Sequence, residues 1–256
     1  MATVSQSDRK TWIVDLDGVV WLAGTPIPGC DEAVRRLRAA GVRVLFVTNN
    51  SAPTMEELLA RLARVGIDAE ADDLVTSAQA AAQLLEPGQR ALALADGGAT
   101  QALAARGVEL VEGAPADAVV VGWTHNFDFA RLTLAARVIR DGARLIGTNE
   151  DSTHPTPEGL LPGSGALLAA VATASDTVPE VAGKPHRPIV DLIRRRTDDT
   201  ALVVGDRPST DGALAAALDV PFALVLSGVT ASADAEPPAP DFCAPDLLAL
   251  VNDRLG

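Results

Sequence analysis

The stretch TWIVDLDGVVW, from Thr11 to Trp21, decides the fold class that this sequence predicts. Its apolar start predicts a buried strand, and that strand ends abruptly in Asp15, Asp17 and Gly18. In an open α/β sheet the ligand crevice lies outside the carboxyl ends of the strands. Side chains two residues apart on an extended segment point the same way, so both acids can converge on one target. The alternative interpretation is an ordinary Asp-Gly turn.

The size and charge of the chain limit the classes of function. Its 256 residues, 48% of them hydrophobic, can bury the core of one large domain or two modest ones. We expect neither a membrane span nor a signal peptide, because no apolar run is long enough and residues 1–10 lack an apolar core. A formal net charge of -13 argues against a nucleic-acid partner. Cys30 and Cys243 form no metal-binding spacing, which favours two free thiols in a reducing cytoplasm.

Two further polar clusters follow predicted strands. The apolar segment 42–47 ends in Thr48, Asn49, Asn50 and Ser51, whose hydroxyl and N–H donors suit a phosphoryl group but also a plain helix cap. The segment 200–204 ends in GDRPSTD, which adds two more acids. Together with the first cluster, these strand ends predict one shared crevice.

The remaining patterns alternate strands with helices. A capping box at Thr54 and Glu57 predicts a helix to about residue 65. The polar, Pro- and Gly-rich segment 148–165 predicts a long loop, and DAEPPAP at 234–240 another. Further predicted strands cover 90–95, 117–122, 143–147 and 221–226, and further predicted helices cover 31–40, 99–106, 127–141, 166–174, 188–196 and a terminal stretch from about 244.

Lysine is rare in this chain. Of its 21 cations only Lys10 and Lys184 are lysines, and all others are arginines. Since an ammonium is a compact point charge and a guanidinium a planar fork, Lys184 is a candidate for a chemical role. The alternative is a lysine retained on the surface by chance.

The ordered set DLDGVVW, TNNS, GKP and GDRPSTD resembles the haloacid dehalogenase superfamily. Within it the set is similar to subfamily IIA, the NagD-like and 4-nitrophenylphosphatase branch, which carries a C2-type cap. The stretch NEDSTHPTPEGLLPGSG resembles the signature of that cap. The resemblance implies an α/β fold, with a Rossmann-like doubly wound parallel sheet as core and a smaller α/β cap domain inserted in it. The implied boundaries are 1–78 for the first part of the core, 79–178 for the cap and 179–256 for the second part of the core.

The resemblance also implies a reaction. Asp15 would be the nucleophile that forms an aspartyl-phosphate, and Asp17 the general acid and then the general base. Mg²⁺ would be held by Asp15, the Asp17 carbonyl and Asp206, with Asp211 as a direct or water-mediated ligand. Asp17 favours a phosphatase over a dehalogenase, because a halide leaving group needs no proton.

The same resemblance implies that three further residues stabilise the charge on the transferring phosphoryl oxygens. These residues are Thr48, Asn49 and Lys184. The fourth motif departs from the family pattern GDRL.TDI at Pro208 and Gly212, and ADGGATQAL departs from the common pattern early in the cap.

Candidate leaving-group contacts follow a predicted cap strand. Trp123, His125 and Asn126 are assigned to substrate specificity, with Thr124, Glu150 and Asp151 as further candidates. The alternative for Trp123 is a packed aromatic, and for His125 a helix-capping residue. No role is assigned to His154 or His186.

We therefore expect a Mg²⁺-dependent phosphatase of small phosphorylated metabolites such as glycerol phosphate, phosphoglycolate, sugar phosphates or nucleoside monophosphates. Such caps suggest a homodimer formed through the cap. Two alternatives stay open: a receiver-like module that accepts a phosphoryl group for signalling, and a catalytically idle binding protein on the same fold.

Overall fold

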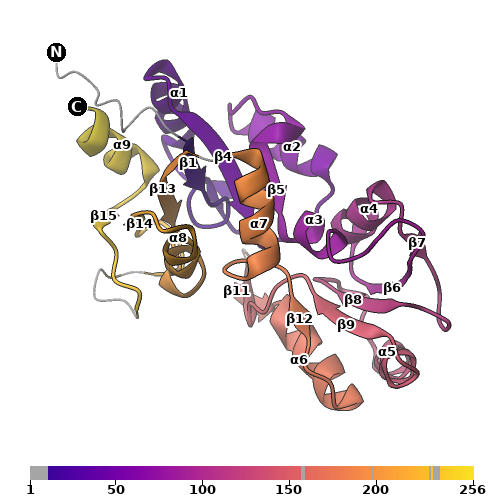
Figure 1. Cartoon of the computed structure of the whole chain (residues 1–256). Coiled ribbons are helices and arrows are strands. Elements are labelled where there is room, and N and C mark those ends of the chain that lie inside the picture. The colour runs from indigo at the N-terminus through magenta and orange to yellow at the C-terminus, as the bar shows by residue number, and fades with distance from the viewer. Residues whose placement is uncertain (1–10, 157–158, 198, 231, 233–236) are drawn as a thin grey trace. The chain divides into compact units, whose positions relative to one another are not determined.

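The computed structural model of the chain describes residues 11–156, 159–197, 199–230, 232 and 237–256. Residues 1–10, for which no signal peptide was expected and which include Lys10, lie outside the described residues. So does part of the loop predicted at 234–240. The chain forms two compact units (Figure 1). The first comprises Met1–Thr48, Leu59–Val75 and Val190–Gly256, and the second Asn49–Leu58 and Thr76–Ile189.

The first unit is built on a six-stranded sheet whose order reverses next to its first strand. The order is β15-β14-β13-β1-β4-β5, and the pairs β1–β13, β1–β4, β13–β14 and β14–β15 are parallel. The chain thus winds outward from β1 in one direction and returns on its other side, as a doubly wound fold does. The strands are β1 (Thr11–Val14), β4 (Arg43–Thr48), β5 (Leu74–Thr76), β13 (Thr200–Gly205), β14 (Phe222–Val225) and β15 (Phe242–Ala244).

Burial explains why these strands are parallel and internal. Every residue of β1 and β14 is buried, without the alternation of a sheet that faces water on one side. Helix α1 packs against β4 and α9, and α8 packs against β13. The helices of this unit are α1 (Cys30–Ala39), α8 (Ala213–Leu218) and α9 (Leu247–Leu255), and the short strands β2 (Trp21–Leu22) and β3 (Thr25–Pro26) pair as a hairpin.

Helices α2 (Met55–Arg64) and α7 (Arg187–Arg196) run across the unit boundaries. The predicted capping box precedes α2, since the Thr54 amide donates to Glu57 Oε2 at 2.9 Å and the Glu57 amide to Thr54 Oγ1 at 3.2 Å. Such a cap stabilises a helix by about 1 kcal/mol.

The second unit is a further α/β layer of similar size, with its own core. Its parallel sheet has the order β12-β9-β8-β6-β7. Val119 and Val121 of β8 pack with Val138 of α5 and Val171 of α6 in one buried cluster. Its elements are α3 (Ser77–Ala82), β6 (Arg90–Leu94), α4 (Gly97–Ala105), β7 (Glu109–Leu110), β8 (Ala118–Val121), α5 (Phe129–Arg140), β9 (Arg144–Gly147), β10 (Thr153–Thr156), β11 (Gly159–Pro162), α6 (Ser164–Ser175) and β12 (Glu180–Val181).

Three details of the sequence prediction were wrong. The predicted loop at 148–165 contains the antiparallel hairpin β10–β11 and the start of α6. The terminal helix begins at Leu247 and not near residue 244, because Phe242–Ala244 pair as β15. Short elements β5 and α3 were not predicted, since three and six residues carry too little periodicity.

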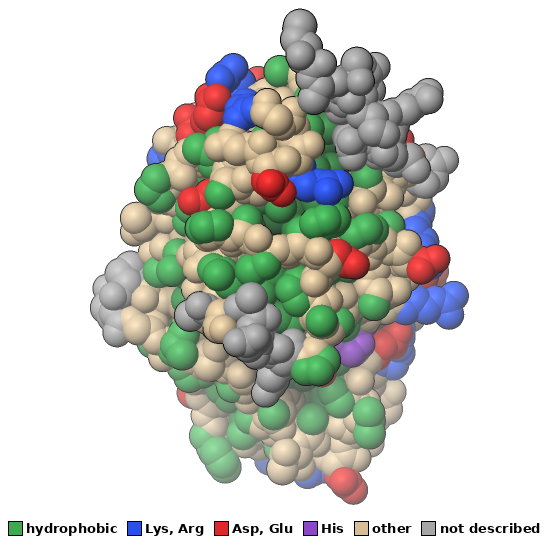
Figure 2. All heavy atoms as spheres, turned by 90° about the vertical axis from the view of Figure 1, so that its left-hand side faces the viewer, with side chains coloured by type: hydrophobic (Ala, Val, Ile, Leu, Met, Phe, Trp, Pro, Cys, Tyr) green, Lys and Arg blue, Asp and Glu red, His purple; other side chains and the backbone are tan. Residues whose placement is uncertain are grey.

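The face of the first unit that carries α8, β15 and α9 shows hydrophobic side chains interspersed with polar ones and few charged ones over its middle (Figure 2). Scattered apolar side chains are ordinary on a protein surface. Within the described ranges, no helix has both the length and the apolarity needed to cross a bilayer.

Candidate active site

The register of two neighbouring strands brings the first and third polar clusters together. In the β1–β13 pair Val14 lies opposite Val204, and the Asp15 amide donates to the Val204 carbonyl at 2.9 Å. Asp15 therefore leaves the sheet beside Gly205, one residue before Asp206. This edge is the point at which the strand order reverses, where α/β sheets bind their ligands.

Three carboxylates converge at this edge. Asp15, Asp206 and Asp211 are 8%, 1% and 1% exposed, and each offers an oxygen within 4.8 Å of the oxygens of the other two. Asp211 reaches the cluster because Pro208–Gly212 form a single π turn, in which the Arg207 amide donates to Asp211 Oδ2 at 3.1 Å. Pro208, at which the fourth motif departs from the family pattern, thus lies in the turn that carries Asp211.

Glycines give these acids room. A β-carbon at Gly205 would lie 2.1 Å from the Asp211 carboxylate carbon, and one at Gly18 would lie 2.4 Å from that of Asp206. Gly18 also has a φ of +91°, a conformation that other residues rarely adopt. The glycine of DLDG is therefore required by both space and backbone.

Asp17 is held beside this cluster by two side chains. The Trp21 indole Nε1 donates to Asp17 Oδ1 at 3.1 Å, and the Thr48 hydroxyl lies 3.5 Å from Asp17 Oδ2, at the long limit of a hydrogen bond. Thr48 is the last residue of β4, the strand next to β1, so the predicted meeting of the first two clusters is present in the first unit. The role of Trp21 was not predicted, although its spacing of four residues was visible in the sequence.

Sequence reasoning also missed the segment after β14. The Val229 amide donates to Asp206 Oδ2 at 2.6 Å, and the Ser227 hydroxyl donates to the Gly18 carbonyl at 2.7 Å. A β-carbon at Gly228 would lie 2.0 Å from Asp206 Oδ2. The signal available was a Ser-Gly pair closing one more strand of the same sheet.

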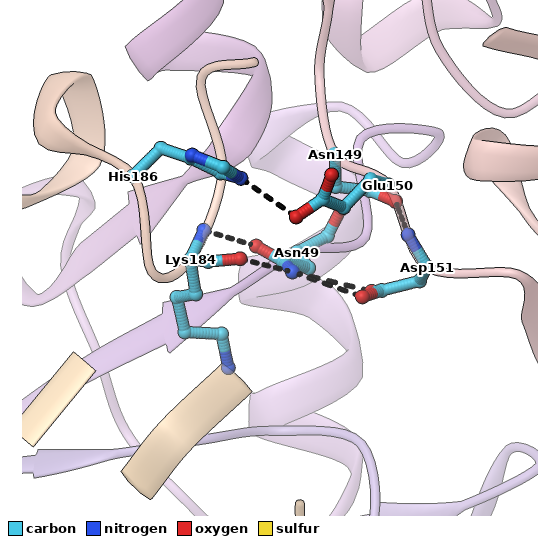
Figure 3. A network of polar contacts seen from close by, with 6 residues as sticks. All are labelled: Asn49, Asn149, Glu150, Asp151, Lys184 and His186. Atoms are coloured by element: carbon cyan, nitrogen blue, oxygen red, sulfur yellow. Dashed lines mark hydrogen bonds and ion pairs between the residues drawn. The ribbon is translucent and has the colours of Figure 1, made fainter. Parts of the chain in front are cut away.

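Asn49 and Lys184 belong to the second unit, where they contact each other directly. The Lys184 amide donates to Asn49 Oδ1 at 2.7 Å, and Asn49 Nδ2 lies 3.3 Å from the Lys184 carbonyl (Figure 3). Both are buried, and Lys184 is only 2% exposed. The alternative of a chance surface lysine is therefore wrong.

The candidate specificity residues form a small aromatic group in the second unit. The rings of Trp123 and His125 meet edge to face with centroids 4.4 Å apart, and the His154 ring lies 5.2 Å from Trp123. The indole also donates to the Pro162 carbonyl at 3.1 Å. Asn126 is exposed on the same turn, where its amide donates to the Thr124 hydroxyl.

The alternative reading of His125 as a helix cap is wrong. Helix α5 starts at Phe129, and its cap is Asp128, whose side chain accepts from the Arg131 amide at 2.8 Å. His125 instead contacts Trp123, and it is exposed. Its ring is thus available for contacts outside the helix.

The chemistry of the donor set in the first unit suits a hard divalent cation. Octahedral Mg²⁺ binds oxygens at 2.0–2.1 Å, which places neighbouring ligand oxygens about 3 Å apart. The carboxylate oxygens of the cluster, all within 4.8 Å of one another, are near enough to share one such ion. Two unit charges 4.8 Å apart repel by about 3 kcal/mol at an effective dielectric constant of 20. A cation between the carboxylates would offset that repulsion.

Comparison with known proteins identifies the family. A family model described as haloacid dehalogenase-like hydrolase matches residues 12–109, and a second, HAD-hydrolase-like model matches residues 181–250. The D-glycerol 3-phosphate phosphatase of Mycobacterium tuberculosis is 39% identical over 265 residues, covering 99% of this chain and 74% of that protein. This chain belongs to the haloacid dehalogenase-like hydrolases.

Other relatives of this haloacid dehalogenase-like hydrolase are also phosphatases. The acid sugar phosphatase of Staphylococcus saprophyticus is 33% identical, covering 89% of this chain and 90% of that protein. The dihydroxyacetone phosphatase of Corynebacterium glutamicum is also 33% identical, covering 88% and 83%. The family resemblance read from the four motifs is thereby confirmed.

Solved structures agree with this assignment. The glycerol phosphate phosphatase from Mycobacterium tuberculosis, solved in complex with magnesium, has a TM-score of 0.88 at 38% identity, covering 98% of this chain and 78% of that chain. The p-nitrophenyl phosphatase from Archaeoglobus fulgidus has a TM-score of 0.87 at 30% identity, covering 95% and 98%. The predicted α/β fold class is confirmed.

Proposed function

We propose that this haloacid dehalogenase-like hydrolase is a Mg²⁺-dependent phosphatase that hydrolyses small phosphate monoesters through an aspartyl-phosphate on Asp15. The observation that supports it best is the convergence of the buried Asp15, Asp206 and Asp211 carboxylates at the carboxyl end of β1 and β13. Its relatives are named phosphatases of glycerol 3-phosphate, sugar phosphates and dihydroxyacetone phosphate.

The first half of the reaction transfers the phosphoryl group to the protein. A carboxylate oxygen of Asp15 forms a bond to phosphorus while the bond from phosphorus to the ester oxygen breaks. Protonated Asp17 gives its proton to the departing oxygen, which leaves as an alcohol. The Trp21 indole and the Thr48 hydroxyl beside Asp17 orient that acid for the transfer.

The second half restores the enzyme. Asp17, now a carboxylate, takes a proton from a water molecule, which attacks the phosphorus of the aspartyl-phosphate and releases inorganic phosphate. Asp15 returns to its starting form and Asp17 is again protonated. Thr48, Asn49 and Lys184 are assigned, on the family resemblance, to stabilising the charge on the transferring phosphoryl oxygens.

Asp15, Asp206 and Asp211, with the Asp17 carbonyl, would hold the cation. When bound, Mg²⁺ supplies positive charge that lets an anionic carboxylate approach an anionic phosphate ester. The protein's own contribution is to bring the three acids together, Asp15 and Asp206 just after the ends of β1 and β13 and Asp211 on the following π turn, with Gly18, Gly205 and Gly228 leaving them room.

Three-carbon phosphate esters are the first substrates to test, because two of the relatives are named for them. The aromatic group of Trp123 and His125, together with Asn126, is the proposed contact for the leaving alcohol.

We propose that the chain divides into a core domain of residues 1–78 and 179–256 and a cap domain of residues 79–178. We also propose a homodimer formed through this cap, to be checked by light scattering coupled to size-exclusion chromatography.

The two cysteines support a location in a reducing compartment. Cys30 is buried and Cys243 exposed, and both are free thiols. Since secreted proteins commonly pair their cysteines, we propose a cytoplasmic enzyme.

Hydrolysis of 4-nitrophenyl phosphate, with Mg²⁺ and with a chelator, tests the proposed function. We expect turnover with Mg²⁺, none with the chelator, and faster turnover on glycerol phosphates in a panel scored by phosphate release. A stable aspartyl-phosphate without turnover would instead indicate the receiver-like module. No reaction and no phosphorylation would indicate the idle binding protein.

A further inference from the structure

The side-chain amide of Asn49 is surrounded by partners from two other loops of the second unit. Its Oδ1 accepts from the Lys184 amide at 2.7 Å. Its Nδ2 lies 3.3 Å from the Lys184 carbonyl and 3.2 and 3.3 Å from the two carboxylate oxygens of Asp151. Since an amide nitrogen has two hydrogens, these contacts use its donor capacity.

The Asn49 side chain therefore makes a clamp, by which we mean that it hydrogen-bonds both the amide and the carbonyl of the Lys184 main chain. Figure 3 shows the Lys184 side chain running away from Asn49, so that Asn49 contacts only the main chain of Lys184. The orientation of the Asn49 amide decides whether the clamp works, because a flipped amide would turn a donor toward the Lys184 amide. A carboxylate accepts hydrogen bonds and donates none, so Asp151 selects the correct orientation.

The same loop braces Asn49 and the Lys184 loop at further points. Asn149 Nδ2 donates to the Asn49 carbonyl at 2.6 Å, and His186 Nε2 lies 2.8 Å from Glu150 Oε1. Gly183 permits this close approach, since a β-carbon there would lie 2.6 Å from Asn49 Oδ1. Three consecutive residues, Asn149 to Asp151, thus secure the segment that carries Lys184 (Figure 3).

We propose that Asp151 is a positioning residue, which acts through the Asn49 amide to hold the Lys184 main chain in place for the phosphoryl-transfer step. This inference rests on the proposed function, in which Lys184 stabilises the charge on the transferring phosphoryl oxygens. The Asn49 amide is buried and Asp151 is half-buried, and a charge-assisted hydrogen bond is stronger than a neutral one, so the loss of this contact should be measurable. Glu150 is exposed and His186 is half-buried, so the contact between these two side chains should matter less.

Kinetics of 4-nitrophenyl phosphate hydrolysis test the proposal. We expect Asp151→Ala to lower kcat about 10-fold or more with KM changed less than about 2-fold, and Asp151→Asn, which keeps an amide oxygen, to restore most of it. The double variant Asp151→Ala/Lys184→Ala should be no slower than Lys184→Ala alone. Asp141→Ala, an exposed acid of the same unit, is the matched control.

Several outcomes would overturn the proposal. These are an unchanged kcat in Asp151→Ala, multiplying effects in the double variant, or a raised KM at constant kcat, which would indicate direct substrate contact. Melting curves correct each rate for the folded fraction. A wild-type enzyme without turnover would instead refute the proposed function.

A second measurement does not depend on activity. Because Lys10 and Lys184 are the only lysines, protein labelled with ¹⁵N-lysine gives two main-chain amide signals, and Lys184→Arg identifies one of them. Asp151→Ala should shift the Lys184 signal and speed its hydrogen exchange by about 10-fold, while the Lys10 signal stays unchanged. An unchanged Lys184 signal would refute the positioning role even in an active enzyme.

Discussion

Replacing Asp15 by asparagine should abolish turnover without destabilising the protein. At the 4.8 Å limit of the cluster, each pair of carboxylates repels by about 3 kcal/mol at an effective dielectric constant of 20. Asp15 takes part in two such pairs, so its neutralisation removes about 6 kcal/mol of repulsion from the metal-free protein when all three acids are ionised. Asparagine keeps the shape and the main-chain bond from residue 15 to Val204.

The expected result has two parts. In a chelator, Asp15→Asn should melt at the same temperature as the wild type or higher, by about 2–4 °C for each kcal/mol of repulsion relieved. With 4-nitrophenyl phosphate its turnover should fall roughly 1000-fold or more, because an amide is not a nucleophile. Mg²⁺ should raise the melting temperature of the wild type more than that of the variant.

Differential scanning fluorimetry and release of 4-nitrophenol are the measurements. Asp253→Asn, a charge removed from the exposed side of α9 in the same unit, is the matched control. Substantial residual activity in Asp15→Asn would refute the nucleophile assignment. A lower melting temperature in the chelator, with the control unchanged, would refute the argument from repulsion.

Three other predictions concern single positions. Lys184→Arg should lower kcat despite the retained charge, because a planar guanidinium cannot replace a buried ammonium, and a near-wild-type rate would contradict this. Gly205→Ala should cost about 1–3 kcal/mol and weaken Mg²⁺-induced stabilisation, since its methyl would lie 2.1 Å from the Asp211 carboxylate carbon; unchanged melting would contradict it. Burial, and then a neighbouring carboxylate, raises the pKa of Cys30, so its thiolate forms only at higher pH. The exposed Cys243 should therefore react first with a thiol reagent at pH 8, and simultaneous labelling would refute that order.

The local order of strands and helices could be read from the sequence wherever the apolar pattern was long. The predicted strand at 200–204 is β13, and the helix after the Thr54 capping box is α2. The hairpin β10–β11 could not be read, because Thr153–Thr156 is half-buried throughout and shows no alternation. Strand β15 was not predicted from the sequence, because three residues carry almost no periodicity.

The meeting of the acids was predictable in part. Asp15 and Asp206 each follow a buried strand, and parallel strands of one sheet place such residues at one edge. That β13 lies beside β1, with Val14 opposite Val204, depends on how helices cover both faces of the sheet. The support from Val229 depends on β14 lying next to β13.

By itself, the sequence determined which residue types close each strand, and hence the carboxylates and the lysine available for chemistry. Only the tertiary structure decided which of them share hydrogen bonds, as Asn49 does with Lys184, 135 residues away, and with Asp151, 102 residues away. The physical reason is that hydrophobic burial is set by local periodicity, whereas the partners of a buried polar group depend on packing among distant segments.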